Sequence, residues 1–316
     1  MSSRSPSTRP PSTLVCTITP FDANGALDEA ALAWLLGRIG AAGIGVFLGS
    51  ASPGEGHALS AAETERLYTV ARETLGHRVP VRAMGAEPRR AEELKELIRI
   101  AEAVELDAVQ LYSVDLGHSS RPTDAELERY FRTLLEGMTI PAVLSSHHFG
   151  GYVIPEDVLA RLFDDYPNIA GINVTSPDLA YVTRVVQLVD GRADVHVGGP
   201  MQALSALALG AQGFLCSEGI IVPKLVASVI DNYRRGAMAE TFEAYATLIR
   251  LFSTNVWAGG SIRWTKAAMR VLGMPGWHAR PPYLPLPEGT HPRILASLEA
   301  SGIPELDELP WRQEAA

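Results

Sequence analysis

The sequence predicts an α/β protein, a (β/α)8 or TIM barrel followed by additional C-terminal helices. Short apolar runs bounded by turns alternate with amphipathic stretches of about 10 to 16 residues, the pattern of strand–helix units. Eight such units fit into residues 13–235, which is the length of one barrel. The chain has 316 residues, 47% of them hydrophobic, which is enough to bury a large core.

The units follow one another in a regular order. The predicted strands cover residues 13–19, 45–48, 79–84, 107–112, 141–145, 169–173, 193–197 and 213–216. Their helices are expected at residues 28–42, from Ser60 onward, and at 91–104, 124–138, 155–163, 178–189, 201–209 and 223–233. Ser60 is a suitable N-cap because Glu63 follows three residues later, as in a capping box.

Residues on either side of the barrel have other compositions. Residues 1–12 are rich in Ser, Pro and Arg and lack the apolar centre of a secretory signal, so we expect a disordered tail. Residues 236–316 are expected to form a helical extension packed on the barrel. Its helices are predicted at 239–251, 261–272 and 291–300, interrupted by the Pro-rich segment 281–287. A doubly wound open sheet is the alternative architecture, but no Gly-x-Gly-x-x-Gly follows the first strand.

Composition excludes several kinds of partner. The net charge of −9 disfavours nucleic acid and anionic membranes. No apolar run reaches about 18 residues, so no membrane span is expected. The two cysteines, Cys16 and Cys216, form no disulfide framework, which fits a reducing cytoplasm. We expect a cytoplasmic protein that binds a small-molecule substrate and needs no cofactor.

In a barrel the functional residues lie in the loops at the carboxyl ends of the strands. These loops form a polar rim rich in hydroxyl and imidazole groups. Catalytic candidates are Glu55, Ser145, His147, His148 and Asn173. Candidates for substrate binding are Ser50, Ser52, His118, Thr175, Gly198 and Glu218.

Several segments carry a family resemblance. They are Thr17-Ile-Thr-Pro-Phe-Asp22, Leu48-Gly49 with Gly54-Glu55, Asn168-Ile-Ala-Gly-Ile172, the run 206–213, Val222-Pro-Lys224 and Thr265-Lys-Ala-Ala268. Taken together over residues 14–273, the chain resembles the dihydrodipicolinate synthase / N-acetylneuraminate lyase family of the class I aldolase superfamily. The resemblance implies the barrel fold and a homo-oligomer, either a dimer or a tetramer.

The resemblance also implies chemistry from which this chain departs. Members of the family form a Schiff base between a sixth-strand lysine and a 2-oxo acid, and only an amine can condense in this way. The matching position here is Asn173. The chain has only three lysines, and Lys95, Lys224 and Lys266 all match other positions.

Two further family features are changed. The tyrosine of the family's proton relay is matched by Ser145, and the arginine that holds the substrate carboxylate is missing from the segment 145–150. The fourth loop, 113–120, is about three residues longer than the family's Thr-Pro-Tyr-Tyr run. A Schiff-base aldolase is therefore not expected.

Two interpretations remain. The first is an enzyme with altered chemistry, a lyase, hydratase or isomerase acting on a small oxo or hydroxy acid. In it His147 or His148 exchanges protons near neutral pH, and Asn173 with Ser145 holds a substrate oxygen. Successive residues of an extended segment point in opposite directions, so only one of the two histidines faces the site.

The second interpretation is a catalytically inactive paralogue that binds a small molecule or serves as a structural subunit. A minor branch of the first is a metal-dependent lyase in which His147 or His148 acts with His118, His196 or Glu218. No metal-binding spacing supports this branch. The non-catalytic alternatives are that Glu55 bonds loop amides and that His196 is a core histidine.

Overall fold

The computed structural model of the protein describes residues 9–117, 120–147, 153–257 and 260–310. Its strands form a closed barrel in the order β1 to β8, and the pairings between neighbours are parallel. The strands are β1 Ser12–Cys16, β2 Gly45–Leu48, β3 Val81–Ala83, β4 Ala108–Tyr112, β5 Ala142–His147, β6 Ile169–Thr175, β7 Asp194–Gly198 and β8 Gly213–Cys216. The predicted (β/α)8 fold with additional C-terminal helices is confirmed.

Helices follow the strands in regular alternation. They are α1 Glu29–Ala41, α2 Ala61–Leu75, α3 Ala91–Ala103, α4 Asp124–Leu135, α5 Glu156–Asp165, α6 Leu179–Val189, α7 Ala203–Ala208 and α8 Pro223–Arg234. The C-terminal helices are α9 Met238–Trp257, α10 Ser261–Val271 and α11 His291–Ala300. Short 3-10 turns lie at η1 Gly56–Ala58, η3 Pro200–Gln202, η4 Glu218–Ile220, η5 Glu288–Thr290 and η6 Pro304–Glu308.

Local sequence explains why these helices form. Ser60 caps α2 through the backbone N–H of Glu63, and the Glu63 carboxylate accepts from the Ser60 N–H, which confirms the predicted capping box. Thr123 and Glu126 repeat this arrangement at α4. The buried residues of α4 recur at helical spacing, and each buried apolar side chain stabilises the fold by roughly 1.5–3 kcal/mol.

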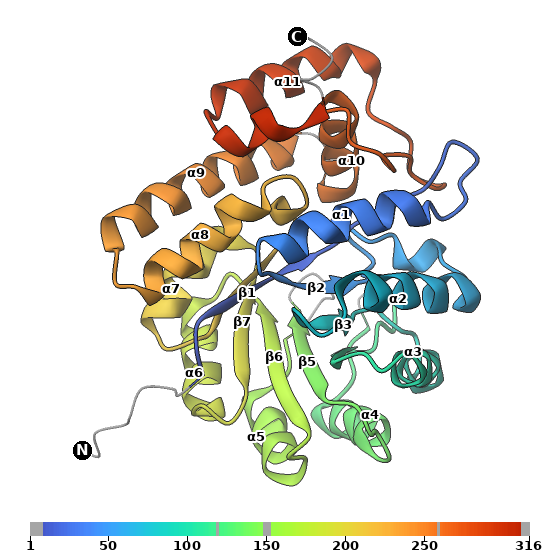
Figure 1. Ribbon diagram of the computed structural model, residues 1–316. Helices are drawn as coiled ribbons and strands as arrows, with labels where there is room; N and C mark the ends of the chain where they lie inside the picture. The colour runs from blue at the N-terminus through green and yellow to red at the C-terminus, as the bar shows by residue number, and fades with distance from the viewer. Residues whose placement is uncertain (1–8, 118–119, 148–152, 258–259, 311–316) are drawn as a thin grey trace. The chain divides into compact units, whose positions relative to one another are not determined.

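The chain divides into two compact units. The first comprises the residues up to Thr13 together with Arg82–Leu215. Within it, Figure 1 shows β5, β6 and β7 side by side, with α4, α5 and α6 outside them. The second comprises Leu14–Val81 and Cys216–Ala316, so residues 216–316 group with 14–81. In this unit α8 runs beside α9, and α10 lies next to α11 (Figure 1). The predicted boundary at residue 235 stays a prediction.

Three strands end two or more residues away from their predicted ends. β1 ends at Cys16 instead of residue 19, β5 continues to His147, and β6 continues to Thr175. The extension of β6 follows from its ladders, since His147 pairs with Thr175 on one side and Val197 pairs with Val174 on the other. Asn173 therefore lies within a strand, where its backbone is fixed on both sides.

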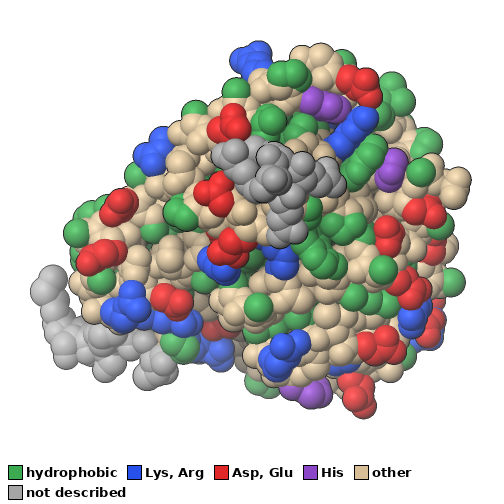
Figure 2. Space-filling view, turned by 45° about the horizontal axis from the view of Figure 1, so that its top comes forward, with side chains coloured by type: hydrophobic (Ala, Val, Ile, Leu, Met, Phe, Trp, Pro, Cys, Tyr) green, Lys and Arg blue, Asp and Glu red, His purple; other side chains and the backbone are tan. Residues whose placement is uncertain are grey.

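Side chains of both charges reach the surface. Figure 2 shows acidic, basic and hydrophobic side chains intermixed on the face in view. No helix among the described residues is both long and apolar enough to cross a membrane.

Candidate active site

The sequence-predicted residues of β5 and β6 share one face of the sheet in the first unit. Ser145 lies opposite Tyr112 of β4 on one side and opposite Asn173 on the other. Asn173 in turn lies opposite His196 of β7. Partners in a parallel ladder present their side chains on the same face, so these four strands place a row of polar groups together.

An amide pair marks the centre of this row. The Asn173 Nδ2 donates a short hydrogen bond to Oε1 of Gln110, which lies on β4, two strands away. Side chains can meet across an intervening strand only on the concave face of a curved sheet, so both amides point to the barrel interior. Both are buried, with Asn173 3% and Gln110 2% exposed.

The oxygen of the Asn173 side-chain amide lacks a described hydrogen-bond donor. Its Oδ1 is buried and has no hydrogen-bond partner among the residues that the structure describes. A buried acceptor without a donor costs about 1–3 kcal/mol, so such an atom calls for a ligand or a bound water. Ser145, 1% exposed, lies next to it in the ladder and supplies a hydroxyl on the same face.

His147 ends β5 on the same face as Ser145. Its ring packs edge-on against Tyr112, with the ring centroids 6.3 Å apart at an interplanar angle of 70°. Tyr112 is itself fixed, because its backbone carbonyl accepts a 2.9 Å hydrogen bond from the Tyr130 hydroxyl. The half-buried imidazole therefore lies on the same face of the sheet as Ser145 and Asn173.

Ser146 faces away from this group and fastens the strand. Its hydroxyl lies 2.6 Å from the Tyr181 hydroxyl of α6 and accepts a 2.9 Å hydrogen bond from the Ile154 N–H. The Tyr181 hydroxyl also donates to the Ile154 carbonyl at 2.7 Å. Burial raises the pKa of Tyr181 to about 12, so it remains a neutral donor. These bonds fix the end of β5, which carries Ser145 and His147.

Thr175 and Gly198 are also brought together. A Cβ atom at position 198 would overlap the Thr175 hydroxyl, so only glycine allows the ends of β6 and β7 to approach this closely. Both were predicted to bind substrate, and the structure places them in one ladder with Asn173.

Ion pairs and hydrogen bonds hold β7 in place. Asp194 begins β7, and its carboxylate lies 3.1 Å from Arg9 and 3.8 Å from Arg82. His196 is 1% exposed and its Nε2 lies 2.8 Å from the Ser12 hydroxyl. Burial, with the nearby Arg82 charge, lowers the pKa of His196 to about 3. His196 is therefore a neutral, hydrogen-bonded histidine of the core, which was the non-catalytic alternative for this residue.

The second unit holds Glu55, whose carboxylate is fully buried. Its Oε1 forms an ion pair with the Lys266 ammonium of α10, and its Oε2 accepts a 2.9 Å hydrogen bond from the Arg280 N–H. The ammonium also donates to the carbonyls of Thr19 at 3.0 Å and His278 at 2.5 Å. All three Lys266 donors are thus engaged. Glu55 thus bonds the Lys266 ammonium and the Arg280 backbone, and its predicted catalytic role stays a prediction.

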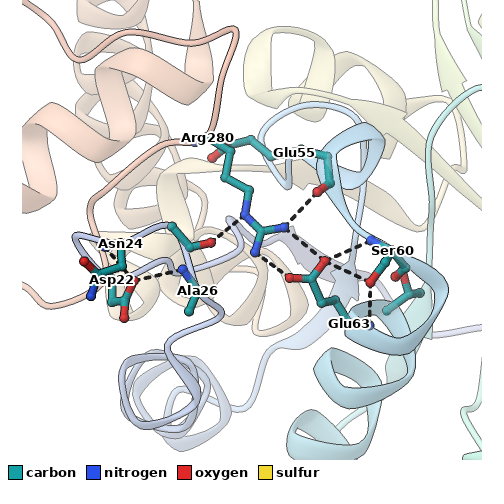
Figure 3. A network of polar contacts seen from close by, with 10 residues as sticks. Asp22, Asn24, Ala26, Glu55, Ser60, Glu63 and Arg280 are labelled. Carbon is teal, nitrogen blue, oxygen red and sulfur yellow. Dashed lines mark hydrogen bonds and ion pairs between the residues drawn. The ribbon is translucent and has the colours of Figure 1, made fainter.

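Arg280 extends this network, which Figure 3 shows from close by. Its guanidinium binds Glu63 at 2.5 Å and also donates to the carbonyls of Gly25 and Ala58. The Arg280 hydrogen bond lowers the pKa of Glu63 to about 2. One arginine therefore connects the start of α2 with the loop before α1.

The predicted serines of this unit shape the loop after β2. The buried Ser50 hydroxyl accepts a 3.1 Å hydrogen bond from the Gly54 N–H, and the Gly54 carbonyl accepts from Thr19 at 2.6 Å. The Ser52 hydroxyl lies 2.8 Å from that of Ser261 at the start of α10. Their predicted role in substrate binding stays a prediction.

Glu218 lies in η4 of the second unit and is 1% exposed. Burial and the Glu218 charge raise the pKa of Cys16 to about 12, and burial raises that of Cys216 well above its ordinary value. Both thiols therefore remain protonated and are poor nucleophiles. Glu218 stays a predicted substrate-binding residue.

Two predicted residues, His118 and His148, lie outside the described residues. Within the part of the chain that is described, no group of three or more His, Cys, Asp and Glu side chains is arranged to hold a metal ion. The metal branch thus gains no support from the described residues.

Sequence reasoning missed Gln110 and Tyr112, although β4 contains a usable signal. The strand reads Ala-Val-Gln-Leu-Tyr, and the polar Gln110 and Tyr112 alternate with apolar residues in a strand buried along its whole length. A glutamine at such a position needs a buried partner. The strand's composition could therefore have identified it.

Comparison with known proteins agrees with this architecture. The model of a family described as the dihydrodipicolinate synthetase family matches residues 10–301. A protein of Geotalea uraniireducens (strain Rf4) named 4-hydroxy-tetrahydrodipicolinate synthase is 25% identical over 292 residues, covering 92% of this chain and 98% of its own. One of the same name from Citrifermentans bemidjiense is 26% identical over 288 residues, covering 90% and 97%.

Two solved structures illustrate the likeness in fold. A prophage protein of the dihydrodipicolinic acid synthase family from E. coli K12, in complex with pyruvate, superposes with a TM-score of 0.86 at 24% identity, covering 93% of this chain and 99% of its own. The 4-hydroxy-tetrahydrodipicolinate synthase of Methylacidiphilum fumariolicum SolV gives 0.85 at 24% identity, covering 95% and 98%.

Proposed function

Because this chain belongs to the dihydrodipicolinate synthetase family, we propose that it is a lyase-type enzyme that acts on a small oxo or hydroxy acid without a Schiff base. Its relatives are named as synthases, and the E. coli family member was solved with pyruvate. The step catalysed is a lyase, hydratase or isomerase reaction. The finer chemistry follows from the residues on β4, β5 and β6.

The single observation that carries the proposal is the side-chain amide of Asn173, whose nitrogen is hydrogen-bonded while its buried oxygen has no described partner. An amide nitrogen cannot condense with a ketone, so the position that matches the family's lysine forms no iminium. What Asn173 presents is a buried acceptor, Oδ1, with its Nδ2 anchored by Gln110. A substrate hydroxyl can donate to that acceptor, and this hydrogen bond orients the hydroxyl for proton transfer.

No other amine supports a Schiff base in the first unit. Lys95 is the only lysine in the sequence of the first unit, and its side chain is exposed on α3. In the second unit, the Lys266 ammonium is engaged by three acceptors and Lys224 forms an exposed ion pair with Glu308 at 2.5 Å.

Acid–base chemistry is assigned to His147. Imidazole exchanges protons near neutral pH, and this ring ends β5 beside Ser145. Ser145 and Asn173 hold the substrate oxygen while His147 moves the proton. In the same proposal the enzyme works in the cytoplasm as a homo-oligomer, a dimer or a tetramer.

Borohydride trapping tests the absence of a Schiff base. The protein is incubated with pyruvate, reduced with sodium borohydride and weighed by intact mass spectrometry, with a lysine-bearing family member as the positive control. We expect the mass of the unmodified chain here and an adduct on the control. An adduct on any of the three lysines would overturn the proposed mechanism.

Turnover separates the enzyme from the inactive-paralogue alternative. Small oxo and hydroxy acids are screened by proton NMR, and Asn173→Leu is expected to lower kcat for the substrate found by about 100-fold. Saturable binding of such an acid without any turnover would instead favour a binding protein.

A further inference from the structure

A second pocket lies wholly within the C-terminal part of the second unit. It has a volume of about 90 Å³ and is bounded by α10, the segment after it and the first residue of α11. Its lining residues are Arg263, Lys266, Ala267, Arg270, Trp277, His278, Ala279, Leu284, Pro285, Leu286 and His291. The lining therefore combines five basic or imidazole side chains with an apolar wall and contains no carboxylate.

The positive charges of the lining differ in how firmly they are neutralised. The Lys266 ammonium is buried against Glu55 and two carbonyls, so it is committed to the fold. Arg263 lies over the Tyr283 ring, with its guanidinium carbon 5.0 Å from the ring centroid. Arg270 is paired with the carboxylate of Glu288, which is largely exposed.

Arg270 is held in a rigid stack. Its guanidinium lies 4.5 Å from the centroid of Trp277, and Trp277 stacks on His278 with centroids 3.8 Å apart at 27°. A guanidinium fixed on an aromatic ring loses little freedom when it binds a carboxylate. The side chain is 32% exposed, so a ligand can reach it.

Arg270 already binds a carboxylate, that of Glu288, which indicates the kind of group that a ligand would place there. Arg270 Nη2 donates a 2.8 Å hydrogen bond to the carboxylate of Glu288, whose side chain is 79% exposed. An ion pair that exposed is weak, so another carboxylate can displace it. Beside it, Leu284 is 73% exposed, which is unusual for an apolar side chain in a pocket wall.

We propose that this pocket binds a small organic anion with a flat apolar group. Its carboxylate replaces Glu288 on Arg270, and its apolar group contacts Trp277 and Leu284. None of its lining residues is among those proposed for catalysis, because all of them belong to the C-terminal helices and their connecting segment.

Benzoate and benzamide provide a matched pair of probes, because they share a shape and differ in charge. Isothermal titration should show saturable binding of benzoate, with a dissociation constant on the order of 1 mM. Benzamide should bind at least about tenfold more weakly, because its neutral amide cannot form the charge-assisted hydrogen bonds.

Variants locate the site. Arg270→Gln should weaken benzoate binding about tenfold, and Trp277→Leu should weaken it several-fold. Glu288→Gln should tighten it several-fold, because the competing internal carboxylate is gone. That side chain is exposed, so this variant should fold normally. Arg250→Gln, at an exposed arginine of α9 outside the pocket, and Asn173→Leu should leave the affinity unchanged.

Three results obtained with the pocket's own ligands and residues would overturn the proposal. They are no saturable binding of benzoate at concentrations on the order of 10 mM, equal binding of benzamide, and unchanged binding in both Arg270→Gln and Glu288→Gln. A loss of affinity in Asn173→Leu alone would place benzoate in the catalytic site and would also reject the pocket. The proposed reaction would be untouched by any of them.

Discussion

The distinctive residue is Asn173, whose side-chain amide has a hydrogen-bond partner for its nitrogen but none described for its oxygen. Asn173 gives its Nδ2 hydrogen to Gln110 and keeps a buried Oδ1 without a described partner. Leaving a polar atom unpaired costs more than removing both partners of a hydrogen bond. The unpaired oxygen thus lowers the free energy of unfolding at the position where a ligand is expected.

The two amides should therefore be coupled energetically. Asn173→Leu and Gln110→Leu should each lower the free energy of unfolding by about 1–3 kcal/mol, since each strands the other amide. The double variant should lose less than the sum of the two. Urea denaturation of the four proteins closes the double-mutant cycle, and additive losses would contradict the coupling.

At the scale of elements, the start of α2 joins local and distant interactions. Ser60 and Glu63 form a capping box that their spacing predicts. The same Glu63 carboxylate is bound by Arg280, which lies 217 residues further along the chain. Sequence spacing revealed the first interaction but not the second, because nothing local to α2 indicates which distant cation will reach it.

This clamp should weaken in acid. The folded-state pKa of Glu63 is about 2, below its ordinary value of 4.5, because Arg280 stabilises the charged form. Its contribution is complete above pH 4.5 and is lost as the pH falls toward 2. We expect about 1–2 kcal/mol after allowing for partial exposure.

Glu63→Gln isolates the charge, because glutamine also completes a capping box. The variant should be less stable than the parent near neutral pH and should match it more closely near pH 2, as urea midpoints would show. An unchanged gap at both pH values would mean that the charge of Glu63 contributes nothing.

At the scale of the whole molecule, His196 makes global stability depend on pH. The folded-state pKa is about 3, whereas its ordinary value is 6.5, because burial disfavours the imidazolium. Below pH 6.5 the unfolded chain binds a proton that the folded chain refuses. Stability should therefore fall by about 1.4 kcal/mol per pH unit as the pH drops from 6.5 toward 3.

His196→Gln tests this dependence. Glutamine can still meet the Ser12 hydroxyl but does not titrate in this range. The slope of unfolding free energy against pH should therefore be smaller in the variant. Equal slopes, measured by urea denaturation at several pH values, would show that other groups cause the acid sensitivity.

The sequence was sufficient for the fold and only partly for the site. Alternation of apolar runs with amphipathic stretches predicted the eight strands, because periodicity is a local property. Strand order also placed Asn173, Ser145, Thr175 and Gly198 near the carboxyl ends of β5, β6 and β7, while their roles at a site stay predictions. Gln110 was missed because its role depends on a contact across β5, and the burial of Glu55 depends on Lys266 from α10.

The amide pair can also exchange its donor and acceptor by rotation of the two side-chain amides, without any change in charge. An amide presents a donor on one side and an acceptor on the other, and a half-turn exchanges them with almost no change in shape. If Asn173 and Gln110 turn together, their mutual hydrogen bond is kept with its direction reversed, and Asn173 then offers N–H instead of oxygen. The side chain of Asn173 can thus bind a hydroxyl or a carbonyl, which are the two oxygen groups of hydroxy and oxo acids. A lysine cannot reverse its polarity in this way.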